Sequence, residues 1–431
     1  MDASRLLSVM KNLTTDTVWG ELLRPALRAL ETVRYPAQRF RVLSMADFLT
    51  LGVLRHVQRW PALREQVQAV LHLADDDVER PPLARSTWSD ALASPERRAV
   101  LAAAWPALVA HAQTVLPDRL GEIPGLGSRP VYAADTTYQP ESAHSPRRTP
   151  REGGTDNPKG HALLTVYDLR LGCPIDVWVE TRSAHELTCL RDYDRHAASA
   201  RTRVKNSLWV VDRAFIDARF WDAKKHNLQC TMITRMKDNL VVDHATAQPV
   251  VATPANHGVV RDERIRLRSS PAVWRRITLE TDAAEVIEFL THELDLEPGV
   301  LAFLYLRRWD TEKCFDTWKN DFAQARAWGV HRVAIENQAR LALFTHLLVA
   351  LWLQDHAAGW GVGDEKALHK QDLRRAEALG EHEPPRWTAV AYRYPSKISR
   401  QVLRFLKHCF LKKPSHVLYE HQLKPMLMAY L

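Results

Sequence analysis

Two short apolar runs that each meet a carboxylate most constrain what this chain can fold into. The first is PVYAADTTY at 130–138 and the second is SLWVVDRAF at 207–215, with Asp135 and Asp212 where the apolar runs end. Short apolar runs bounded by turns are typical of strands buried in a sheet. A carboxylate there is costly to remove from water unless it is paired or binds a metal ion. The sequence therefore predicts a buried sheet with acidic side chains at the ends of two strands.

Strand and helix patterns alternate around these runs. HALLTVYDL and CPIDVWVET flank Leu171-Gly172 as a hairpin, and AHELTCLRDYDRHAASA has a helical pattern. The second Asp-bearing run follows, then a helix and the strand-like CTMITRMK at 230–237. The order is three strands, helix, strand, helix and strand, which predicts an α/β fold with a mixed sheet flanked by helices.

The rest of the chain divides by pattern into regions around this core. The first 125 residues repeat apolar positions at helical spacing, and β-like pieces such as VWRRITLET interrupt the rhythm after residue 237. We expect a helical N-terminal domain at 1–125, the first part of the core at 126–237, a β-rich insertion at 238–295, the second part of the core at 296–375 and a basic helical region at 376–431.

Positive charge gathers at the C-terminal end. The formal net charge is +8, and between residues 386 and 431 basic residues outnumber acids nine to one, with aromatic side chains between them. Such a region favours a polyanionic partner, most simply nucleic acid. A solubilising cationic surface is the alternative that this feature leaves open.

Composition excludes several classes of protein. No apolar run reaches the roughly 18 residues that a membrane helix needs, and the N-terminus lacks the layout of a secretory signal. The five cysteines are far apart and form no CxxC pair, which argues against a disulfide framework and a zinc cluster. We therefore expect a cytoplasmic protein with no membrane partner.

Charged residues interrupt an otherwise amphipathic helix in YLRRWDTEKCFDTWK at 305–319. At helical spacing, Tyr305, Arg308, Glu312 and Lys319 fall within an arc of roughly 60° beside the apolar stripe. One reading is an Arg308–Glu312 surface salt bridge worth a few tenths of a kcal/mol. The other reading is that these side chains line a site that binds metal ions and phosphate, because carboxylates suit Mg²⁺ or Mn²⁺ and arginine suits phosphate.

The spacing on this helix resembles a known signature. Tyr305, two residues, Arg308, three residues, Glu312, six residues and Lys319 are similar to the Y-(2)-R-(3)-E-(6)-K pattern of the DDE transposases of bacterial insertion sequences of family four. AADTT and VVDRAF look like the first and second catalytic aspartate motifs of that family. The resemblance covers roughly residues 130 to 340.

The resemblance implies both a fold and an activity. The fold would be an RNase H-like catalytic core, interrupted by a mostly β insertion and flanked by an all-α N-terminal domain and a helical basic C-terminal domain. The activity would be cut-and-paste transposition: the ends are nicked at inverted repeats, relatives then form a hairpin and reopen it, and a 3′-hydroxyl attacks target DNA. A homodimer on paired double-stranded DNA ends, in a bacterial, nucleoid-associated location, is implied as well.

The resemblance also implies roles for individual residues. Asp135, Asp212 and Glu312 would be catalytic and would bind two Mg²⁺ or Mn²⁺ ions. Tyr305, Arg308 and Lys319 would bind DNA phosphates near the scissile bond. In the insertion, Trp274 with Arg275 and Arg276 is a candidate for stacking on a flipped base and for DNA contact, although a core tryptophan is the alternative.

Two other functions remain open at this point. A structure-specific DNA nuclease on the same RNase H-like core would cut according to junction shape and join no strands. A DNA-binding derivative that has stopped cutting would keep the scaffold, although three retained carboxylates argue against it.

Overall fold

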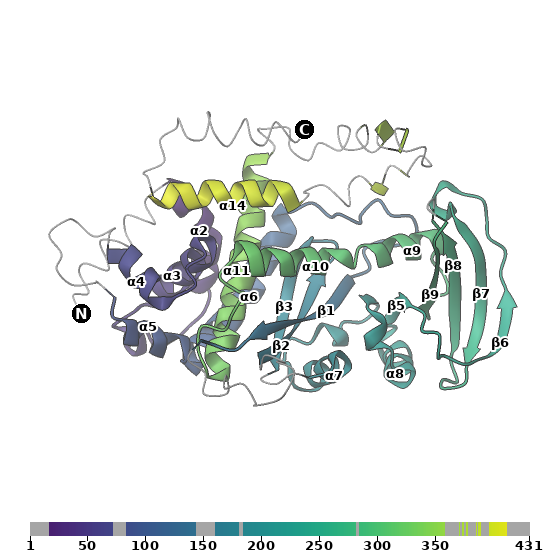
Figure 1. Ribbon diagram of the computed structural model, residues 1–431, viewed down its shortest axis with the longest axis horizontal. Helices are drawn as coiled ribbons and strands as arrows, with labels where there is room; N and C mark the ends of the chain where they lie inside the picture. Colours follow the sequence, from purple (N-terminus) through teal and green to yellow (C-terminus); the bar gives the residue numbers. More distant parts are fainter. Residues whose placement is uncertain are drawn as a thin grey trace, which may run out of the picture.

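A nine-stranded sheet organises the part of the chain that the structure describes (Figure 1). The computed structural model describes residues 17–71, 83–143, 160–180, 184–281, 284–357 and 396–411, with a few positions between 370 and 388. The strand order is β3-β2-β1-β4-β5-β9-β8-β7-β6. The strands are β1 (Val131–Pro140), β2 (Gly160–Asp168), β3 (Cys173–Glu180), β4 (Leu208–Val211), β5 (Thr231–Arg235), β6 (Val242–Ala247), β7 (Val259–Leu267), β8 (Val273–Glu280) and β9 (Val286–Thr291).

The first five strands form the mixed half of the sheet. β2 pairs antiparallel with β1 and β3, whereas β4 is parallel to both β1 and β5. Helices α7 (Glu186–His196) and α8 (Ala218–Leu228) connect the parallel strands and lie on one face of the sheet (Figure 1). The predicted order of three strands, helix, strand, helix and strand is confirmed, including the turn at Gly172, whose φ of 70° suits glycine.

The last four strands continue the same sheet. β6, β7, β8 and β9 are antiparallel neighbours, and β9 pairs antiparallel with β5 at the edge of the mixed half. They fall in the segment where the sequence predicts β structure. The insertion is therefore joined to the first five strands by backbone hydrogen bonds and not only by a linker.

Helices from the first part of the chain lie at the β3 end of the sheet (Figure 1). They are α2 (Thr17–Glu31), α3 (Met45–Gln58), α4 (Leu63–Leu71), α5 (Arg85–Leu92) and α6 (Pro95–Val115). The apolar α11 (Arg332–Ala357) contacts α2, α3, α5 and α6 as well as β3, so it joins these helices to the sheet (Figure 1). α14 (Ser396–Leu411) packs across α11. Among the described residues, no helix is long and apolar enough to cross a membrane.

The charged helix of the sequence is not one regular α-helix. It consists of α9 (Pro298–Leu306), α10 (Trp309–Asp316) and a π-helical turn at Thr317–Asp321. Between α9 and α10 the amide hydrogen bonds shift to a spacing of three, as in Arg308 N–H to the Tyr305 carbonyl at 3.0 Å. The prediction of one regular α-helix over 305–319 is therefore wrong in detail, although α9 and α10 run in nearly the same direction (Figure 1).

Burial of His346 on α11 predicts a loss of stability in mild acid. Burial lowers its pKa to about 4, while an unfolded chain has the ordinary value near 6.5. From pH 6.5 down to about 4 the unfolded chain therefore gains a proton that the folded one does not. The His346 contribution to the free energy of unfolding should fall by up to about 1.4 kcal/mol per pH unit.

Chemical denaturation at several pH values tests this effect in His346→Leu. The difference between wild type and variant should shrink as the pH falls through this window. His111→Leu, at an exposed position on α6, is the control and should follow wild type. A constant difference for His346→Leu would contradict the prediction.

Candidate active site

Asp135 and Asp212 lie side by side on neighbouring parallel strands. Ala134 of β1 is paired with Val211 of β4, so the next residue on each strand is an aspartate. β4 ends at that point and Asp212 begins a short 3₁₀ turn. β1 continues to Pro140 beside β2, so Asp135 lies within its strand and not at the end as the sequence suggests.

Asp135 is largely buried and held by three donors. Its Oδ1 accepts from the Thr136 backbone N–H at 2.7 Å, and its Oδ2 accepts from Arg308 Nη1 at 3.2 Å and Thr311 Oγ1 at 3.5 Å. Burial raises the pKa of Asp135, and the negative charges of Glu312 and Asp212 add to that rise, against the lowering effect of Thr136 and Arg308. The carboxylate is thus placed where a further cation would be stabilising.

Arg308 joins Asp135 to Glu312. Its Nη2 lies 2.7 Å from Glu312 Oε1, while Nη1 reaches Asp135 from the start of α10. The Arg308 side chain is 11% exposed, which is unlike a surface i,i+4 pair. The salt bridge that the sequence allows is therefore present, but it is one half of a bridge between two acids from different elements.

Tyr305 precedes and Lys319 follows Arg308 and Glu312 along the chain. Tyr305 is buried, with its ring 5.1 Å from that of Phe289, and burial raises the pKa of its phenol beside Arg308. Lys319 is exposed on the π-helical turn, and partial burial lowers its pKa while the charge of Asp135 acts to raise it. Both residues are thus near the acidic pair, Tyr305 as part of the core and Lys319 at the surface.

A fourth carboxylate that sequence reasoning missed also faces this region. Glu186 is the first residue of α7, and burial raises its pKa to about 7, with further contributions from Asp135 and Asp212. An acid in the first turn of a helix is common, because it interacts favourably with the helix dipole. Only its position after the third strand of the predicted order could have indicated a place near Asp135.

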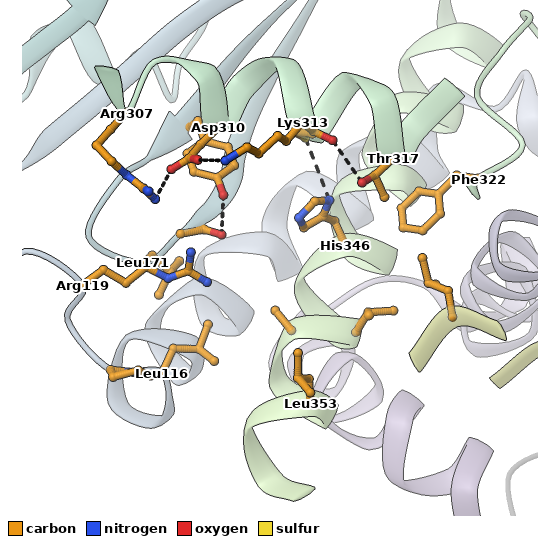
Figure 2. A pocket seen from close by; sticks show the side chains of 17 residues that line it. Leu116, Arg119, Leu171, Arg307, Asp310, Lys313, Thr317, Phe322, His346 and Leu353 are labelled. Carbon is orange, nitrogen blue, oxygen red and sulfur yellow. Dashed lines mark hydrogen bonds and ion pairs between the residues drawn. The ribbon is translucent and has the colours of Figure 1, made fainter. Parts of the chain in front are cut away.

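Charged residues on a different face of α10 serve another purpose. Arg307 and Asp310 form a buried ion pair, and Lys313 lies 3.4 Å from Asp310. With His346 of α11 they line a cavity of about 170 Å³ whose other walls are mostly apolar (Figure 2). The two arginines at the junction of α9 and α10 therefore differ: Arg307 belongs to the core, and Arg308 to the acidic site.

Trp274 is a core residue, which corrects the prediction that it stacks on a flipped base. Its side chain is fully buried, its ring stacks on His292 at 4.6 Å, and its indole N–H donates to Ser270 Oγ at 2.9 Å. No ring face is left for a base. The alternative of a core tryptophan is the one that the structure supports.

The two arginines after Trp274 are also engaged within the insertion. Arg275 is buried and donates through Nε and Nη2 to both carboxylate oxygens of Asp262, at 2.8 and 2.7 Å. Arg276 pairs with Glu263 at 2.7 Å, and both of these side chains are largely buried. Carboxylates hold both guanidinium groups in this structure, so DNA contact by Arg275 or Arg276 stays a prediction that would require these ion pairs to open.

The donor types at the acidic site suit a hard divalent cation. Asp135, Asp212, Glu312 and Glu186 offer only carboxylate oxygens, which Mg²⁺ and Mn²⁺ prefer. Within the described ranges, no three side chains of the His, Cys, Asp and Glu types gather closely enough to hold a metal ion. Arg308 lies between Asp135 and Glu312 instead, so binding of an ion by both acids would require the guanidinium to move.

Comparison with known proteins identifies the family. The family model described as "Transposase DDE domain" matches residues 135–351, which is half of the chain. No curated protein matches the chain. Among solved structures, the chain is similar to a piggyBac transposase in a synaptic complex with hairpin DNA, at 9% identity and a TM-score of 0.39, covering 99% of this chain and 87% of that one. A TM-score this low does not establish a shared fold.

The family match begins at Asp135 and extends past Glu312 into α11, so it contains the paired strands, the insertion and the charged helix described above. It rests on the sequence and is independent of the arrangement of side chains. The chain belongs to the DDE transposase family and is a transposase enzyme.

Proposed function

We propose that this transposase cuts DNA at the inverted-repeat ends of a bacterial insertion sequence of the family-four type and joins the 3′-ends to target DNA. The observation that carries the proposal is the ion-pair bridge from Asp135 through Arg308 to Glu312, beside Asp212 on the neighbouring strand. An acid from a strand and an acid from a helix share a buried arginine there, with a second acid at the end of the neighbouring strand, and such a set of side chains suits phosphodiester chemistry.

Asp135, Asp212 and Glu312 are the residues that would hold two Mg²⁺ or Mn²⁺ ions. Carboxylates fit these ions in donor type. Burial raises the pKa of Asp135, and the negative charges of Glu312 and Asp212 add to that rise, so a cation would be stabilising there. When bound, such ions lower the pKa of an attacking water or 3′-hydroxyl and stabilise the leaving oxygen.

The basic residues of the site are proposed to bind the DNA backbone. Arg308 can exchange its carboxylate partners for phosphate oxygens, because a guanidinium binds both with the same fork of donors. That exchange would free Glu312 from its 2.7 Å pair with Arg308. Lys319 is exposed, and the charge of Asp135 acts on it, so we propose that it takes a second phosphate oxygen. Tyr305 is buried, so its part is to orient Arg308.

We assign the surrounding regions on the same basis. The order β3-β2-β1-β4-β5, with its helical crossovers, supports an RNase H-like core at 126–237 and 296–375, with the insertion at 238–295. The helices of 1–125 and the basic region of 376–431 are proposed to recognise DNA ends and to join two copies into a homodimer. A cytoplasmic, nucleoid-associated location follows from a DNA substrate, and a hairpin intermediate remains part of the proposal.

Purified protein should nick and join DNA that carries both cognate ends in the presence of Mn²⁺. Nicking, hairpin formation and strand transfer are separated on denaturing gels, with a scrambled end as the control substrate. Cleavage governed by junction shape, without joining, would favour a structure-specific nuclease. Tight end binding with no metal-dependent cleavage would favour a derivative that binds but does not cut.

A further inference from the structure

One face of the continuous sheet carries both strand acids and extends into the insertion. Asp135 and Asp212 lie next to each other on β1 and β4, and the register of β4 with β5 places Asp212 beside Arg235. Arg235 pairs with Phe289 of β9, whose ring lies 5.1 Å from that of Tyr305 on α9. Side chains that are opposite each other on neighbouring strands point to the same face. The acidic site and the α9 side of the insertion therefore share one face.

Two arginines of β7 are on this face and reach solvent. Phe289 pairs with Ile277 of β8, and Ile277 pairs with Asp262 of β7, so from Asp262 onward every second residue of β7 is on the face of the acidic site. These residues are Asp262, Arg264 and Arg266, of which Asp262 is buried and the two arginines are exposed. α9 contacts β7 and β8 (Figure 1). The arginines are thus the solvent-exposed positions of β7 on this face.

Neither arginine is neutralised within the insertion. Arg264 is directly opposite Arg275 on β8, and like charges in that arrangement are destabilising. Asp262 offsets the charge of Arg275 through hydrogen bonds of 2.8 and 2.7 Å. Among the described residues, Arg264 and Arg266 have no ion-pair partner. Their charge is therefore available to a bound anion.

The distance from the strand acids suits a DNA duplex that lies across the sheet. β7 is four strands from β4 in the order β4-β5-β9-β8-β7, and neighbouring strands are about 4.8 Å apart. Arg264 and Arg266 are thus roughly 20 Å from Asp212, a length that about six base pairs of double-stranded DNA span. Since a guanidinium binds phosphate oxygens with a fork of donors, these arginines can hold the duplex whose cleavage is proposed above.

We propose that Arg264 and Arg266 form a surface that binds the phosphate backbone of double-stranded DNA about six base pairs from the cleaved bond. This inference rests on the proposed function, because it assigns a further contact to the same DNA. Phosphate contacts position a duplex and do not read its base sequence. Because β5 and β9 are paired, the sheet sets the spacing between this surface and Asp212.

The test measures binding of full-length protein to labelled duplexes of about 30 base pairs, without divalent cations and at several salt concentrations. Arg264→Gln and Arg266→Gln should each reduce the slope of log affinity against log salt by about 1. The double variant should reduce it by about 2 and should bind a cognate and a scrambled end about tenfold or more weakly. Arg261→Gln is the matched control and should bind as wild type does, because Arg261 is exposed on the same strand but on the opposite face.

Duplex length tests the distance. The duplex is shortened to about three base pairs on one side of the cleavage site, and on each side in turn. On the side that the surface contacts, shortening should abolish the difference between wild type and the double variant. An effect of the double variant that persists on both shortened duplexes would overturn the proposal.

Replacing both arginines with lysine keeps the charge, so a folding defect of the glutamine variants would not decide the question. Arg264→Lys with Arg266→Lys should retain most of the affinity and the wild-type salt slope. Wild-type affinity and slope in the double glutamine variant, or an equal change in Arg261→Gln, would overturn this inference, even if the protein cuts its ends. DNA binding that depends on both arginines, with no metal-dependent cleavage of any end, would count against the proposed transposition alone.

Discussion

Replacing Glu312 with glutamine is expected to lower the rate of strand cleavage about a thousandfold or more, while the affinity for DNA ends changes little. Glutamine can still accept from Arg308 Nη2, so the bridge to Asp135 and the local fold should survive. On the proposed function, the variant loses a negatively charged metal ligand, and the transition-state stabilisation by a bound ion amounts to several kcal/mol. A thousandfold change corresponds to about 4 kcal/mol.

Single-turnover cleavage and equilibrium binding of the same labelled DNA end separate the two effects. Glu285→Gln is the matched control, because that glutamate is 63% exposed on the insertion. The control should cut at the wild-type rate. If Glu312→Gln lost end binding and cleavage in equal measure, Glu312 would have a structural role and not a catalytic one.

Asp262→Ala is expected to destabilise the folded protein by about 3–5 kcal/mol. The change leaves the Arg275 guanidinium buried with no counter-charge, since the Asp262 side chain holds it through two hydrogen bonds and both side chains are under 10% exposed. Among the described residues, the Leu296 carbonyl would remain as a partner, at 2.7 Å from Nη1. Denaturant unfolding followed by tryptophan fluorescence measures the loss.

Asp243→Ala provides the comparison within the same insertion. Asp243 pairs with Arg268 at 3.0 Å, but these side chains are 46% and 71% exposed, so the loss should be below about 1 kcal/mol. The double variant Asp262→Leu with Arg275→Met should recover much of the stability, because it removes both charges. Equal losses in Asp262→Ala and Asp243→Ala would show that the buried pair adds no more than a surface pair does.

The sequence predicts the order of the core elements because local patterns determine it. β1 and β4 are apolar runs with an aspartate in each, and the turn at Gly172 follows from a glycine between two alternating segments. The parallel pairing that brings Asp135 next to Asp212 is not a local property. It depends on the helical crossover that returns the chain to β1, so the sequence could suggest the pairing without fixing its register.

Three features lay beyond sequence reasoning for different physical reasons. The break between α9 and α10 arises from a change in hydrogen-bond spacing that leaves the apolar pattern almost unaltered. Trp274 and Arg275 are found in the core because Ser270 and Asp262 provide partners for their polar groups, and an arginine-rich strand does not reveal such pairs. Glu186 resembles any first-turn acid until its buried neighbours are known.

The pairing of β5 with β9 has a mechanical consequence. Ile233, Thr234 and Arg235 of β5 pair with Thr291, Leu290 and Phe289 of β9. The insertion is therefore a continuous extension of the core sheet. A rotation of the insertion relative to the core would require the backbone hydrogen bonds between β5 and β9 to break together. We therefore expect the insertion to keep its conformation when double-stranded DNA binds. Bending and twisting must then come from the DNA and from parts of the chain outside the sheet.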